Sequence, residues 1–215
     1  MAILNTLLSF VLPKNCIFCG GRIYTNASIC PGCIGSLPYL GGDDYRRGLY
    51  FSRCVSLFNY EGKIANAVKA FKYRGKYKYA DTLGAMLAAL IKRQGEEFDI
   101  ITYVPQSAAR AFARGYNPSR LLALEASKRL APIPCKKLMR KVRHTRRQVG
   151  KSAVERRENL TGSFALAKNA DVVQKRILII DDVVTTGATL EECALTLVRA
   201  GAAEVTCATL AKTRR

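Results

Sequence analysis

The segment "RILIIDDVVTTGATLEEC", residues 176–193, joins an apolar run to two adjacent acids and continues into hydroxyl residues and a glycine. An uninterrupted apolar run is typical of a strand that is covered on both faces, so we expect a buried strand over residues 176–180. Apolar residues at helical spacing follow, and they predict a helix from residue 189 to residue 199 or 200. The acids Asp181 and Asp182 therefore stand where the strand is expected to end, which is where open parallel sheets bind ligands.

The residues after the acids have the composition of a phosphate-binding loop. Glycine lets the backbone approach an anion closely, threonine hydroxyls donate hydrogen bonds, and the free N–H groups of a helix start attract phosphate. The acids would repel a second phosphate, whereas the neighbouring hydroxyls of a ribose would donate hydrogen bonds to them. The segment therefore predicts a ribose 5-phosphate site, with the ribose on Asp181 and Asp182 and the phosphate on Val184, Thr185, Thr186, Gly187, Ala188 and Thr189.

Two other interpretations of the acid pair stay open. Receiver domains also place two acids at a strand end, but near the start of the domain, whereas here only one strand is expected after the acids. A turn that stabilises the fold without a ligand is the second alternative. Three hydroxyl residues, a glycine and two acids are costly to keep for that purpose alone.

Strands and helices are expected to alternate along the chain. Apolar runs predict strands at the start of residues 53–62, over 98–105, within 133–143, in a short stretch ending near 166, and over 203–210. Apolar residues at helical spacing predict helices after Gly62, within 82–94, and late in 106–130, where a loop carrying Arg110 and Arg114 comes first. This order predicts an α/β fold with a mostly parallel sheet flanked by helices.

The stretch "KYRGKYKYA", residues 72–80, interleaves four bases with three tyrosines. Tyrosines among bases can stack on nucleobases. A solvated face on which lysine stems cover apolar surface is the alternative.

Four of the eight cysteines fall in one short segment near the start of the chain. Their pattern is C-x2-C, ten residues, and C-x2-C, which suits four thiolates around a structural zinc ion, namely Cys16, Cys19, Cys30 and Cys33. A redox pair or two disulfides are the alternatives, and an intracellular setting argues against both.

The formal net charge of +19 favours an anionic partner. Residues 136–157 hold ten Lys or Arg residues and one acid, and they are expected to form a flexible basic loop that includes Arg143, Arg146, Arg147 and Lys151. The loop could close over a phosphorylated ligand, lie along nucleic acid, or be merely solvated. The first apolar stretch is too short to cross a bilayer and lacks the marks of a secretory signal, so we expect a soluble, cytoplasmic protein without a membrane span.

Three stretches resemble known families. The segment "ILIIDDVVTTGAT" resembles the phosphoribosyl-pyrophosphate (PRPP) motif of type I phosphoribosyltransferases. The stretches "VPQSAARAFARGYN" and "RHTRRQVGKSAVERRENLTGSF" resemble two sequence blocks of the ComF family, and a four-cysteine amino-terminal finger is typical of that family. The resemblance covers nearly the whole chain, and Lys151 departs from it because relatives more often carry an apolar residue there.

The resemblance implies a type I phosphoribosyltransferase-like fold with three parts. These are an N-terminal helix and zinc finger at 1–40, a linker at 41–53, and a phosphoribosyltransferase-like domain at 54–215. The implied ligand is PRPP, together with Mg²⁺ if the protein is active. Arg110 and Arg114 are candidates for holding pyrophosphate, because guanidinium groups match phosphate oxygens.

Two functions stay open at this point. The first is a PRPP-binding, phosphoribosyltransferase-like protein that acts in natural competence, the uptake of single-stranded DNA. The second is a binding module for single-stranded DNA or for DNA-uptake proteins, in which the PRPP-type pocket is not catalytic. The sequence assigns no catalytic residue and no acceptor substrate.

Overall fold

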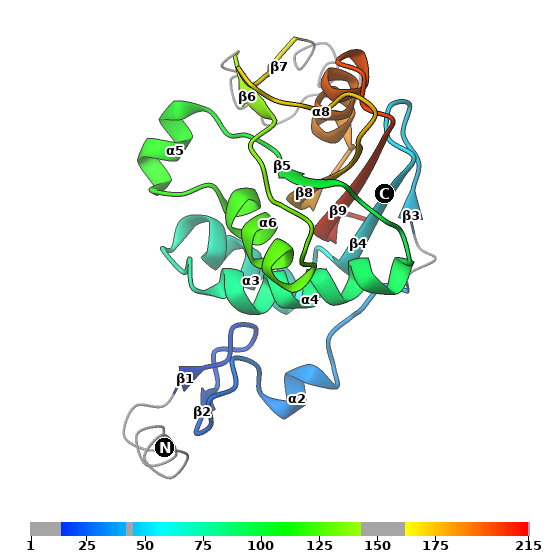
Figure 1. Cartoon of the computed structure of the whole chain (residues 1–215). Helices are drawn as coiled ribbons and strands as arrows, with labels where there is room; N and C mark the ends of the chain where they lie inside the picture. The colour runs from blue at the N-terminus through cyan, green and yellow to red at the C-terminus, as the bar shows by residue number, and fades with distance from the viewer. Residues whose placement is uncertain (1–13, 42–44, 143–161, 215) are drawn as a thin grey trace.

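A computed structural model describes residues 14–41, 45–142 and 162–214 of the chain. Its centre is a five-stranded sheet (Figure 1). The strands lie in the order β3 (Tyr45–Arg46), β4 (Arg53–Asn59), β9 (Glu204–Lys212), β8 (Arg176–Val184) and β5 (Ile100–Tyr103). All neighbours pair in parallel except β3, which is antiparallel to β4. The expected α/β fold with a mostly parallel sheet is confirmed.

Helices cover both faces of the sheet (Figure 1). One layer holds α3 (Gly62–Tyr73), α4 (Tyr79–Gln94) and α6 (Pro118–Arg129), and the opposite face is covered by α8 (Ala188–Arg199). Alternate residues of β8 point to opposite faces of the sheet. Leu178 and Ile180 pack towards the three-helix layer, whereas Ile177 and Ile179 pack towards α8. This double burial explains the uninterrupted apolar run in the sequence. None of the helices in the described part of the chain has the length and apolar character needed to cross a bilayer.

Strand β8 is longer than expected. It was expected to end at residue 180, but it continues through both acids to Val184, because β9 keeps pairing with it as far as Lys212. On its other side, β5 ends at Tyr103, opposite Ile180. The acids therefore lie on a paired strand with one edge open, rather than in a loop beyond the strand.

The stretch that carries Arg110 and Arg114 is also corrected. It was expected to be a loop, but it contains the short helix α5 (Ala108–Arg114). The Ser107 side chain accepts a hydrogen bond from the backbone N–H of Arg110 at the start of this helix, and Gly115 ends it in the left-handed conformation. The two expected strands before and after the basic loop are present as β6 (Met139–Lys141) and β7 (Phe164–Leu166), which pair with each other outside the main sheet.

The cysteine-bearing segment contains β1 (Lys14–Asn15), β2 (Arg22–Ile23) and α2 (Pro31–Ile34). It packs on the three-helix side of the main core, where the rings of Phe18 and Phe58 lie 6.0 Å apart. The proposed boundaries at residues 40 and 53 stay predictions, and the expected N-terminal helix falls in residues 1–13, outside the described residues. Within the expected linker, however, residues 45–46 form strand β3.

Candidate functional site

A cavity of about 230 Å³ lies at the carboxyl end of β8. Its lining includes the acid pair, Thr189 from the start of α8, and both arginines of α5. The structure therefore brings Asp181, Asp182, Arg110 and Arg114 together around one space, as expected for a ligand with a diol at one end and an anion at the other.

The acid pair is held by donors from two helices of the three-helix layer. Lys72 of α3 places its Nζ atom 2.6 Å from Oδ1 of Asp182, and the two side chains are 18% and 9% exposed. The Ser119 hydroxyl of α6 donates to Oδ1 of Asp181 at 2.6 Å, and the backbone N–H of Asp182 donates to the same oxygen at 2.9 Å. Each carboxylate therefore has a partner in the ligand-free protein.

The neighbouring acid still affects the protonation of Asp181. Burial and the neighbouring Asp182 carboxylate raise the pKa of Asp181 to about 7, although Ser119 and Lys72 act against this rise. Burial alone would lower the pKa of Lys72, but the charge and hydrogen bond of Asp182 outweigh it and raise that pKa. Hydroxyl donors of a ligand would favour the charged form of Asp181, because they bind a carboxylate better than a carboxylic acid.

The predicted phosphate loop, called the phosphate loop below, comprises Val184, Thr185, Thr186, Gly187, Ala188 and Thr189. Gly187 precedes the first residue of α8 and has a φ angle of +87°, which side chains other than that of glycine rarely allow. The backbone N–H of Ala188 is 3.4 Å from the Thr186 hydroxyl oxygen, and the Thr185 carbonyl accepts a hydrogen bond from Nη1 of Arg46 at 2.8 Å. The loop thus has the helix-start geometry that binds anions.

The basic side of the cavity comes from α5 and β6. The Arg114 guanidinium lies 4.7 Å from the centre of the Tyr73 ring. Lys141 of β6 lines the cavity near Arg110, and burial followed by the charge of Arg110 lowers its pKa. A second cavity of about 460 Å³ shares Lys72, Tyr73, Arg110 and Arg114 with the first, and all the charged residues among its described lining are basic.

Three residues of the site were missed from the sequence. Lys72 falls in the tyrosine-rich basic stretch, for which the sequence suggested base stacking or a solvated face. Neither interpretation predicted its ion pair with Asp182. Ser119 and Arg46 carried no local signal, because their partners are 62 and 139 residues away in the sequence. The residues predicted for the flexible basic loop lie outside the described residues, namely Arg143, Arg146, Arg147 and Lys151.

The four clustered cysteines form a candidate metal centre. The sulfur atoms of Cys16, Cys19, Cys30 and Cys33 all lie within 4.8 Å of one another. The Sγ atoms of Cys19 and Cys30 are 3.7 Å apart. Four sulfurs at about 2.3 Å from a tetrahedral zinc ion are about 3.8 Å apart, so the spacing suits such an ion. The backbone N–H of Gly21 also points at the Cys19 sulfur, at 3.4 Å.

Two thiols of this cluster have pKa values shifted in opposite directions. Burial raises the pKa of Cys16, but backbone N–H donors outweigh it and lower that pKa to about 6. Burial and the neighbouring thiols raise the pKa of Cys33 to about 12. A bound cation would favour the thiolate forms, because a thiol that coordinates a metal releases its proton to solvent and binds as the thiolate.

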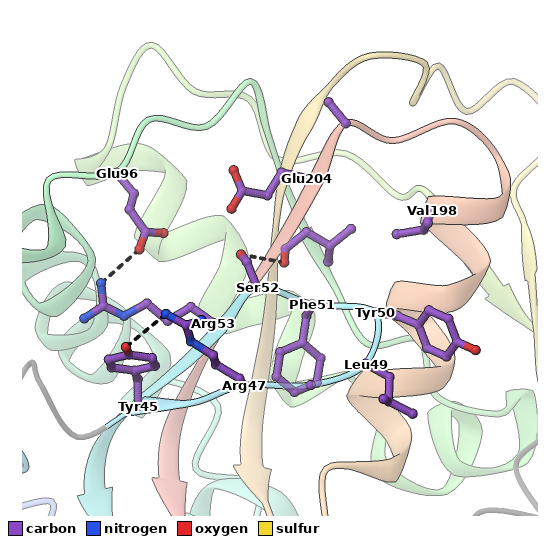
Figure 2. A pocket seen from close by; sticks show the side chains of 13 residues that line it. Tyr45, Arg47, Leu49, Tyr50, Phe51, Ser52, Arg53, Glu96, Val198 and Glu204 are labelled. Atoms are coloured by element: carbon purple, nitrogen blue, oxygen red, sulfur yellow. Dashed lines mark hydrogen bonds and ion pairs between the residues drawn. The ribbon is translucent and has the colours of Figure 1, made fainter.

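A larger cavity of about 610 Å³ lies at the amino ends of β4 and β9 (Figure 2). Arg53 pairs there with Glu96 at 3.1 Å, and its guanidinium lies 4.3 Å from the centre of the Tyr45 ring. Ligands of open parallel sheets bind at the carboxyl ends of the strands. We therefore regard the smaller cavity beside the acid pair as the candidate ligand site.

Comparison with known proteins gives matches in sequence and in fold. Residues 117–215 match the family model described as a phosphoribosyl transferase domain. Competence protein F of Haemophilus influenzae is 29% identical over 88% of this chain and 93% of its own. The DNA utilization protein YhgH of Salmonella typhi is 31% identical over 88% of this chain and 86% of its own. A purine phosphoribosyltransferase from Pyrococcus horikoshii aligns with 62% of this chain and 72% of its own, at 23% identity and a TM-score of 0.41.

Proposed function

Because the chain belongs to the ComF family of phosphoribosyltransferase-like proteins, we propose that it binds PRPP or a related phosphoribosyl ligand and acts in natural competence. The relatives named for competence and DNA utilization support the cellular role. A cluster of free thiols suited to zinc supports a cytoplasmic location as part of the same proposal.

One observation carries the ligand proposal: the acid pair and the α5 arginines share a cavity with Thr189, the one residue of the phosphate loop that lines it. Asp181 and Asp182 would accept hydrogen bonds from the ribose hydroxyls. The loop amides and hydroxyls of residues 184–189 would hold the terminal phosphate. Arg110 and Arg114 would bind pyrophosphate, because their guanidinium groups match its oxygens.

Two metal ions belong to the proposal. Zinc would be held by Cys16, Cys19, Cys30 and Cys33 in a closed structural site, since all four ligands come from the chain. Mg²⁺ would arrive with PRPP, because the pyrophosphate oxygens are the hard ligands that it prefers. When bound, Mg²⁺ would neutralise charge on the pyrophosphate as it leaves.

The proposal concerns binding, and group transfer would need an acceptor molecule. In such a transfer, the acceptor nucleophile would form a bond to the anomeric carbon while the bond to pyrophosphate breaks. The arginine pair would stabilise the charge that builds on the leaving pyrophosphate.

Thermal unfolding and calorimetric titration with PRPP and Mg²⁺ test the proposal. We expect PRPP to raise the melting temperature of the wild-type protein, since a ligand that binds only the folded state stabilises it. The double variant Asp181→Ala, Asp182→Ala should lose this shift, whereas Asp171→Ala, at an exposed acid, should keep it. Equal shifts in the wild type and the double variant would contradict the proposal.

Single-stranded DNA is a second partner that we propose, on the strength of the relatives' names and of exposed tyrosines among bases. Tyr73 and Tyr77 are more than half exposed, and Lys76 stands between them in the sequence. Affinity for a single-stranded oligonucleotide should fall steeply as salt rises. Neutralising Arg146, Arg147 and Lys151 together should flatten this dependence, and an unchanged slope would argue against the basic loop as the contact.

A further inference from the structure

The segment between β3 and β4 contacts the phosphate loop and the start of α8. We call residues 45–50 the β3 strap. At one end of the strap, Nη1 of Arg46 donates to the Thr185 carbonyl at 2.8 Å. At the other end, the backbone N–H groups of Leu49 and Tyr50 donate to the Glu191 carboxylate at 2.9 to 3.1 Å. Figure 2 shows Leu49 and Tyr50 beside helix α8.

The strap approaches Glu191 too closely for a larger residue at Gly48. A Cβ atom on Gly48 would lie 2.5 Å from Oε1 of Glu191 and 2.5 Å from a ring carbon of Phe51. The Phe51 ring is buried, so it has little room to move aside. The strap and the first turn of α8 are therefore in close contact at Gly48.

Arg46 also packs against the middle of the phosphate loop. A Cβ atom on Gly187 would lie 3.3 Å from Nη1 of Arg46, so the guanidinium lies against the loop backbone. Arginine keeps its charge at any physiological pH. Its position adds positive charge beside the amides that start α8, where the helix dipole already favours an anion.

Two effects of these contacts favour a preformed loop. The bond to the Thr185 carbonyl fixes the orientation of a peptide in an exposed part of the loop. The bonds to Glu191 fix the first turn of α8, which follows directly. Binding sites whose donors are held in place lose less entropy when the ligand arrives.

We propose that Arg46 is a positioning residue for the phosphate loop, and that the β3 strap holds the loop ready for the terminal phosphate of a ribosyl ligand. This inference rests on the proposed function, because it assumes that the loop takes a phosphate monoester. It assigns a role to a segment expected to be a linker and lying before the matched phosphoribosyl transferase domain at residues 117–215.

The test compares Arg46→Met with Arg47→Met in the full-length protein. Both variants remove one positive charge from the strap, but Arg47 contacts Tyr45 and its hydroxyl rather than the loop. Amide hydrogen exchange of residues 185–190 is measured first, without ligand. We expect Arg46→Met to speed this exchange about tenfold, the effect of losing one hydrogen bond to a charged group. Arg47→Met should leave it within about twofold of the wild type.

Ligand affinities are then measured by calorimetry with ribose 5-phosphate and, separately, with pyrophosphate and Mg²⁺. Arg46→Met should lower the affinity for ribose 5-phosphate about tenfold. The affinity for pyrophosphate should stay within about twofold of the wild type, because Arg110 and Arg114 lie on α5 rather than on the strap. Arg46→Lys should recover part of the loss, since it restores the charge but not the planar guanidinium.

The outcomes separate the two proposals. Unchanged loop exchange in Arg46→Met would overturn the positioning role, whether or not any ligand binds. Equal losses of affinity for both probes, with a large fall in melting temperature, would also overturn it, because they indicate general destabilisation. If Arg46→Met exchanges its loop amides faster but the wild-type protein binds neither probe, the positioning role of Arg46 is supported and the proposed function is contradicted.

Discussion

The Nζ atom of Lys72 lies 2.6 Å from Oδ1 of Asp182, so the acid pair of this chain has a counter-ion within the protein. Two adjacent carboxylates in a mostly buried site repel each other, and a cation at this distance offsets part of that cost. A ribosyl ligand would bring its hydroxyl donors to an acid pair that already has a cationic partner.

Replacing Lys72 with methionine should destabilise the ligand-free protein. The variant leaves the Asp182 carboxylate without its cation, and removing one partner of a largely buried pair costs about 1–3 kcal/mol when some solvent reaches it. Urea unfolding would measure the change. Lys69→Met, at an exposed position of the same helix, is the matched control, and equal stability of the two variants would contradict the prediction.

The raised pKa of Asp181 predicts an unusual dependence of stability on pH. The pKa of Asp181 is about 7 in the folded protein, whereas the ordinary pKa of an aspartate is 3.8. At a pH between these two values, the folded chain therefore holds a proton that the unfolded chain has released. This group therefore makes the folded state less stable as the pH rises from 4 to 7, by at most about 1.4 kcal/mol per pH unit.

Asp181→Asn is the comparison for this prediction, because its amide resembles the neutral acid and does not titrate. The stability of the wild type relative to this variant should fall as the pH rises from 4 to 7 and level off above 7. Chemical unfolding at a series of pH values would show it. A difference that is constant with pH would mean that Asp181 keeps an ordinary pKa.

Removal of the metal should unfold the cysteine-bearing segment. Burial and the neighbouring thiols raise the pKa of Cys33, so a cation is needed to hold Cys33 as a thiolate at neutral pH, and the segment has few buried side chains of its own. A strong chelator should release zinc and lower the melting temperature by about 5 °C or more. Cys30→Ser should act in the same way, whereas Cys135→Ser, outside the cluster, should bind zinc normally. Stoichiometric zinc in Cys30→Ser would contradict the four-cysteine site.

Gly48→Ala should loosen the phosphate loop, although it removes no side chain that forms a hydrogen bond to the loop. Its new methyl group would meet the buried Phe51 ring and Glu191, so the strap or these side chains must shift and the bonds from the strap to Glu191 are disturbed. We expect faster amide exchange at residues 185–190 and weaker ribose 5-phosphate binding, as in Arg46→Met. Gly41→Ala is the control, because a Cβ atom there meets nothing within 4 Å. Normal exchange in Gly48→Ala would show that the strap is not needed to hold the loop.

Local features of the sequence predicted the mostly parallel sheet and the motifs of the candidate site. The acids, the phosphate loop and the cysteine pairs are each a short continuous motif, so spacing and residue type could be interpreted without the fold. The predicted end of β8 was wrong because the length of a strand depends on its partner strand, and β9 pairs with β8 as far as Lys212. Helix α5 was missed because its apolar residues form no buried stripe.

The sequence alone determined that a strand, two acids and a phosphate loop occur in that order, because these features depend on neighbouring residues. Only the tertiary structure decided which residues complete the site. Lys72 from α3, Ser119 from α6 and Arg46 from β3 reach the acids and the loop through packing of distant segments. Side-chain partners of this kind are set by the positions of whole helices and strands, and no local pattern in one sequence records those positions.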